Sequence, residues 1–88
     1  MERVVIIGSG NLAEALARAV AESNLQLVQI YARNTERARA VATLAATRWT
    51  TQPAELADAD LYLVSVSDRA VAEVAAALPL PAHACVAH

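Results

Sequence analysis

The chain has 88 residues, of which 57% are hydrophobic and 18% are charged, and its net charge is −2. This size and composition predict one globular domain and exclude a disordered chain. The charge balance, with no basic stretch, argues against a nucleic-acid-binding protein. The longest uncharged segment, residues 74–88, contains two prolines and is too short for a bilayer span, and no signal peptide is apparent. We therefore expect a cytoplasmic protein without a nucleic-acid or membrane partner.

The hydrophobic pattern predicts strands that alternate with helices. Residues 3–7 are β-branched and almost wholly apolar, which is typical of a strand buried on both faces of a parallel sheet. Residues 11–23 repeat apolar side chains at helical spacing. In chain order, the expected strands are 3–7, 25–32, 47–50, 61–66 and 82–87. The expected helices are 11–23, 36–46 with Thr35 as its N-cap, a short helix at 54–57 with Pro53 in its first turn, and one that is capped by Ser67 or Asp68 and ends before Pro79.

This order predicts an α/β fold built on a doubly wound parallel sheet with right-handed crossovers. The expected strand order is 3-2-1-4-5, with residues 3–7 at the centre of the sheet. Because such a domain usually continues past its fifth strand, we expect the chain to be a truncated or excised N-terminal domain.

A glycine motif follows the first expected strand directly. Residues 8–13 read GSGNLA and fit the pattern G-x-G-x-x-A. In a dinucleotide fingerprint, the first glycine makes a tight turn, the second admits the pyrophosphate, and the third small residue lets the helix pack on the strand. The start of the helix adds N–H donors and a positive dipole end. This context favours a pyrophosphate site over the alternative of a simple turn. The predicted contacts are Gly8, Ser9, Gly10, Asn11, Leu12 and Ala13.

The end of the second expected strand bears on which dinucleotide binds. An NAD site usually places Asp or Glu about 20 residues after the glycines, but no acidic residue lies between Glu22 and Glu36. Arg33 offers a planar donor fork that suits a 2′-phosphate, with neutral donors beside it. We therefore predict NADP(H) in preference to NAD, the alternative being that Arg33 is a solvated loop residue. The predicted contacts here are Ala32, Arg33, Asn34 and Thr35.

The segments GSGNLAEAL and ARNTERA resemble the corresponding segments of pyrroline-5-carboxylate reductases. The chain is also similar to the NADP-binding domains of the hydroxyisobutyrate dehydrogenase superfamily and of bacterial two-domain reductase-like proteins. The resemblance implies that residues 1–88 form a Rossmann-like NAD(P)-binding domain, and that a helical C-terminal domain, absent from this chain, dimerises and holds most of the substrate pocket.

The same resemblance implies that the backbone near Val66 and Ser67 lines the dinucleotide. The alternative, that Ser67 and Asp68 cap a helix, is compatible with it. The chain departs from the reductases after the fourth expected strand, where they carry an Ala-Val-Lys-Pro type of segment and residues 64–68 read VSVSD. The departure leaves the substrate open.

These features predict the cofactor domain of an NADP-dependent reductase or dehydrogenase that transfers hydride to a small imine or carbonyl compound. The 88-residue piece alone is expected to bind cofactor without turnover, and the full-length protein to be a homodimer. One alternative is a non-catalytic domain that senses the dinucleotide. Another is a fold that has lost its nucleotide, against which the intact glycine loop argues.

Few other residues offer chemistry. Cys85 is expected to be a small buried hydrophobe rather than a nucleophile, and as the single cysteine it excludes an internal disulfide. On a strand, His83 and Cys85 would face one way and His88 the other, so no metal site is predicted. His88 could approach the nicotinamide, but the catalytic residues stay unknown. Trp49 and Tyr62 are expected to pack in the core or on the surface rather than stack on a base.

Overall fold

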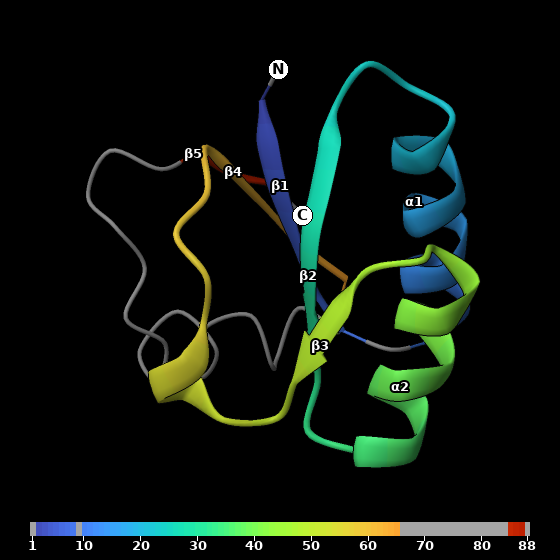
Figure 1. Ribbon diagram of the computed structural model, residues 1–88, viewed down its shortest axis with the longest axis vertical. Helices are drawn as coiled ribbons and strands as arrows, with labels where there is room; N and C mark the ends of the chain where they lie inside the picture. Colours follow the sequence, from blue (N-terminus) through green and yellow to red (C-terminus); the bar gives the residue numbers. More distant parts are fainter. Residues whose placement is uncertain (1, 9, 66–84, 88) are drawn as a thin grey trace.

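The structure is a computed structural model that describes residues 2–8, 10–65 and 85–87. Within these residues, strands and helices alternate along the chain (Figure 1). The elements are β1 (Arg3–Ile7), α1 (Asn11–Ala21), β2 (Gln26–Tyr31), α2 (Thr35–Leu44), β3 (Arg48–Thr50), the 3-10 helix η1 (Pro53–Glu55), β4 (Leu61–Val64) and β5 (Cys85–Ala87).

The strands form one parallel sheet in the order β3-β2-β1-β4-β5. This confirms the predicted doubly wound α/β fold, its strand order and the central place of β1. One local prediction was wrong: the N-cap of α2 is Asn34 rather than Thr35. The short helix expected at 54–57 is present as the 3-10 helix η1, which begins at Pro53 and ends at Glu55. The helix expected after Ser67 or Asp68 lies outside the described residues.

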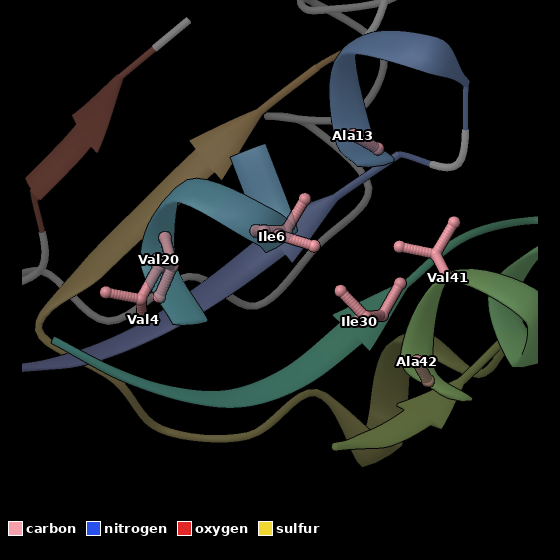
Figure 2. Packing of buried hydrophobic residues seen from close by; sticks show 8 residues of the cluster. Val4, Ile6, Ala13, Val20, Ile30, Val41 and Ala42 are labelled. Atoms are coloured by element: carbon pink, nitrogen blue, oxygen red, sulfur yellow. The ribbon is translucent and has the colours of Figure 1, made fainter. Parts of the chain in front are cut away.

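One face of the sheet packs against both α-helices. The alternation along β1 sends Val4 and Ile6 to this face, where they meet alanine and valine side chains of α1 and α2 (Figure 2). Ala13 and Ala17 are fully buried, and their small size lets α1 lie close to the sheet. The core on this face consists of Val4, Ile6, Ala13, Ala17, Val20, Ile30, Val41 and Ala42.

The other face of β1 carries Val5 and Ile7, which are also buried, so β1 is covered on both sides as its sequence predicts. Part of the cover comes from residues 51–60, which we call the connector. Figure 1 shows the connector, in yellow, on the side of the sheet away from α1 and α2. No helix in the described part of the chain is long and apolar enough to cross a membrane.

Side-chain hydrogen bonds hold the connector on the sheet. The buried Gln29 of β2 donates from Nε2 to the carbonyl of Glu55 (3.0 Å) and accepts the N–H of Ala57 (2.8 Å). The Tyr62 hydroxyl of β4 donates to the carbonyl of Ala57 (2.7 Å) and accepts the N–H of Ala59 (3.1 Å). Tyr62 is therefore a core residue, as expected.

Candidate functional site

The carboxyl ends of the parallel strands lie side by side at one edge of the sheet. The N–H of Gly8, after β1, donates to the carbonyl of Tyr31 in β2 (2.8 Å). The N–H of Ser65, after β4, donates to the carbonyl of Ile7 in β1 (2.8 Å). From β1 the chain continues to β2 on one side, whereas β4 lies on the other, so this edge is the topological switch point. Open α/β sheets bind their ligands in the crevice at such a point.

Gly8 is required by the fold itself. Its φ angle is +134°, a conformation that side chains rarely allow. A Cβ atom built on Gly8 would overlap the hydroxyl oxygen of Ser65 and would lie 2.7 Å from its carbonyl oxygen. Any larger residue at position 8 would therefore have to displace the end of β4.

Gly10 is not required by the fold in either of these ways. Its φ and ψ angles, −84° and −168°, belong to extended backbone that any residue adopts. Within the described residues, a Cβ atom built on Gly10 would have no heavy atom within 4 Å apart from those of Gly10 itself and of the adjoining chain. Gly10 is itself the N-cap residue of α1 and, having no side chain, makes no side-chain cap hydrogen bond. A glycine here fits a ligand that comes close to the backbone, as a pyrophosphate does.

The first turn of α1 divides the remaining residues of the motif into two groups. Asn11 and Leu12 are exposed, and Leu12 leaves 60% of its surface accessible. Ala13 is fully buried against the sheet, so its part in the motif is to let α1 pack closely. The first N–H groups of an α-helix have no partner within the helix and are available to an anion.

The end of β2 presents a second polar group of residues at the same edge of the sheet. Arg33, Asn34 and Thr35 are exposed, whereas Ala32 is buried and its N–H donates to the carbonyl of Thr50 (3.2 Å). The side-chain oxygen of Asn34 accepts the N–H of Arg37 (3.0 Å) and so caps α2. The side-chain amide nitrogen of Asn34 takes no part in this hydrogen bond and carries two N–H donors.

Sequence reasoning overlooked Arg37, which lies in the first turn of α2. Arg37 is a second exposed arginine at the start of α2, four residues after Arg33 in the sequence. Both arginines also interact with other groups of the protein. The sequence feature that could have identified Arg37 is its position three residues after Asn34, the residue that caps α2. Of the other predicted site residues, Ser9, Val66, Ser67 and His88 lie outside the described part of the chain. The residues that the structure describes contain no cluster of His, Cys, Asp or Glu that could hold a metal ion.

The parallel sheet and the glycine loop at its switch point define a dinucleotide-binding domain of the Rossmann type. Residues 3–86 match the family described as NADP oxidoreductase, coenzyme F420-dependent, and the chain belongs to this family. It is thus an NAD(P)-binding oxidoreductase domain, which confirms the predicted relationship to NADP-binding reductase domains.

Solved structures share this fold. A protein from Bacteroides fragilis whose assignment as an NADP oxidoreductase is provisional is 36% identical to this chain, with a TM-score of 0.87. The match covers 97% of this chain and 34% of the Bacteroides fragilis chain. A shikimate 5-dehydrogenase-like protein is 29% identical with a TM-score of 0.67, over 75% of this chain and 24% of its own. Shikimate dehydrogenase from Mycobacterium tuberculosis, 20% identical with a TM-score of 0.74, shares the fold over 97% of this chain and 43% of its own. No curated protein matches the chain significantly.

Proposed function

We propose that this domain binds NADP(H) for a reductase or dehydrogenase that transfers hydride to a small imine or carbonyl compound. The observation that carries the proposal is the open space at Gly10. Among the residues that the structure describes, neither the backbone angles nor the packing explains a glycine there, whereas a pyrophosphate at the start of α1 would explain it.

The proposed contacts to the pyrophosphate are the glycine loop and the exposed start of α1. Gly8 shapes the turn, Gly10 leaves room for the phosphates, and the N–H groups of the first helical turn donate to them. Bound NADPH would supply the hydride, while the protein binds and orients the cofactor. The remaining proposed contacts of this region are Ser9, Asn11, Leu12, Val66 and Ser67.

The preference for NADP over NAD rests on the end of β2. No acidic residue lies between Glu22 and Glu36 to accept a hydrogen bond from a 2′-hydroxyl at the end of β2. Arg33 and Arg37 are exposed beside the first turn of α2, which also carries Glu36. A guanidinium is permanently charged and planar, and it can donate two parallel hydrogen bonds to one phosphate group. The start of α2 adds the positive end of its dipole.

The substrate site is proposed to lie mainly in a further domain. This chain corresponds to 34% of the Bacteroides fragilis protein, and the similar two-domain reductases carry a helical, dimerising C-terminal domain. We accordingly propose residues 1–88 as the cofactor domain of a homodimeric enzyme, inactive without the rest of the protein.

The binding test is a fluorescence titration of the chain with NADPH and with NADH. NADPH should bind at least about tenfold more tightly, a difference of roughly 1.4 kcal/mol. Absence of binding for both cofactors would overturn the proposal.

The activity test follows NADPH oxidation by the full-length protein with a panel of cyclic imines, small keto acids and, because the family description names it, coenzyme F420. Turnover with an imine or a carbonyl compound would support the proposed reaction. Turnover with coenzyme F420 alone would replace the proposed substrate class, and tight binding without any turnover would favour a dinucleotide sensor.

A further inference from the structure

Ser65 makes two hydrogen bonds to the peptide group at which the glycine loop begins. Both its N–H (2.8 Å) and its hydroxyl (3.2 Å) donate to the carbonyl oxygen of Ile7. On the opposite side, the N–H of Gly8 donates to the carbonyl of Tyr31 (2.8 Å). The peptide group between Ile7 and Gly8 is therefore held by β4 at its carbonyl and by β2 at its N–H.

The Ser65 hydroxyl also fills the space that a side chain at position 8 would need, since a Cβ atom on Gly8 would overlap it. The chain turns out of the sheet at Gly8, where φ is +134°, and Gly10 and the start of α1 follow within three residues. The direction in which the loop leaves β1 thus depends on a contact from another strand, 58 residues away in the sequence.

We propose that Ser65 is a positioning residue for the dinucleotide. Its hydroxyl fixes the peptide group between Ile7 and Gly8, and thereby the place of the backbone that receives the pyrophosphate. This inference rests on the proposed function, because it concerns the same site. A backbone that is already ordered loses less conformational freedom when the ligand binds, so removing the hydroxyl should weaken binding even where the fold persists.

The chain offers a matched control in Ser23. Its hydroxyl also donates to a backbone carbonyl, that of Val20 (2.7 Å), but just beyond the last turn of α1, away from the glycine loop. Ser65→Ala and Ser23→Ala each remove a serine hydroxyl that is bonded to a carbonyl. Only the first of them touches the loop. Ser65→Thr retains a hydroxyl at the site.

The experiment measures the Kd of NADPH and of adenosine 2′-phosphate for the chain and these three variants, with circular dichroism melts on the same samples. Ser65→Ala should raise the Kd of NADPH about fivefold, because ordering the less restrained loop would oppose binding, and Ser65→Thr should restore most of the affinity. Ser23→Ala should lower the Tm and leave both Kd values unchanged. Adenosine 2′-phosphate, which lacks the pyrophosphate, should bind Ser65→Ala as well as it binds the original chain.

Unchanged NADPH binding by folded Ser65→Ala would overturn the inference while leaving the proposed function intact. So would an equal loss for adenosine 2′-phosphate, or an equal loss in Ser23→Ala, since either would show a general effect on stability. Failure of the original chain to bind NADPH at all would overturn the proposed function, and this inference with it.

Discussion

Gly8 is packed against Ser65, which occupies the position of its absent side chain. Gly10 lies two residues further on, and within the described part of the chain the corresponding position is open. The fold therefore explains the first glycine, and the proposed pyrophosphate would explain the second. Substitutions at the two positions should separate stability from binding.

Gly10→Ser should keep the domain folded and weaken NADPH binding by at least about tenfold, or 1.4 kcal/mol. Serine is an N-cap at least as good as glycine, so the start of α1 should lose no stability, but its side chain would occupy the space proposed for the pyrophosphate. Gly10→Val should abolish binding altogether. Circular dichroism and a fluorescence titration on the same sample decide the matter, and undiminished NADPH binding by folded Gly10→Val would remove the phosphate role.

Gly8→Ala should instead lower the free energy of unfolding by roughly 2 to 4 kcal/mol, because it adds backbone strain and a clash with Ser65. Chemical denaturation measures this effect. The double variant Gly8→Ala with Ser65→Gly should recover only part of the loss, since the carbonyl oxygen of Ser65 would still lie 2.7 Å from the new Cβ atom. Full recovery would show that the contact with the carbonyl oxygen of Ser65 and the backbone strain at position 8 are both negligible.

Arg33→Ala should erase most of the preference for NADPH over NADH. The affinity for NADPH should fall about tenfold, while that for NADH should stay nearly constant, because only NADPH carries the 2′-phosphate. Arg48→Ala is the control, since Arg48 is an exposed arginine at the start of the edge strand β3. An equal loss for both cofactors would place Arg33 on the shared part of the dinucleotide, and an original chain that prefers NADH would contradict the assignment.

Asn34→Asp should keep α2 folded and shift the cofactor preference of the domain from NADPH toward NADH. Aspartate caps a helix about as well as asparagine, so the hydrogen bond to the N–H of Arg37 can persist. Its negative charge would repel a 2′-phosphate and should weaken NADPH by at least about tenfold relative to NADH. Asn34→Ala, which loses the cap, should cost about 1 kcal/mol of stability. Parallel titrations and melts distinguish the two effects, and NADPH binding that tolerates the aspartate would move the 2′-phosphate away from this residue.

Tyr62→Phe should lower the free energy of unfolding by about 1 to 3 kcal/mol, because the buried N–H of Ala59 and the carbonyl of Ala57 lose their shared partner. Burial also raises the pKa of Tyr62 above its ordinary value of 10.0. The folded state therefore holds this proton where the unfolded state releases it, and stability should fall as the pH rises above about 10. Denaturation between pH 8 and 11 should show a smaller alkaline loss in Tyr62→Phe than in Tyr31→Phe. Equal losses in the two variants would exclude Tyr62 as the source.

The glycine loop could be predicted from the sequence because it depends on local pattern, and the strand order could be predicted because doubly wound sheets share a common order. The apolar run of β1, the helical spacing of α1 and the intervening motif lie within 21 residues of the N-terminus. The cap of α2 was misplaced by one residue because Asn34 and Thr35 are both good capping residues, and only the backbone angles select between them.

Other features could not be read from the sequence, because they depend on contacts between distant segments. The contact between Ser65 and Ile7 follows from the register that pairs Val64 with Ile7. The hydrogen bonds that join Gln29 to the connector span 26 and 28 residues of the sequence, so local spacing does not reveal them. The different reasons for Gly8 and Gly10 likewise require the surrounding atoms.

The connector is bonded to two strands that do not neighbour each other. Gln29 holds it from β2, Tyr62 holds it from β4, and β1 lies between these strands in the sheet. Separating either strand from β1 therefore also requires the connector to detach. The two halves of the sheet are expected to unfold as a single cooperative unit, so that the amides of β2 and β4 exchange with the same free energy of opening.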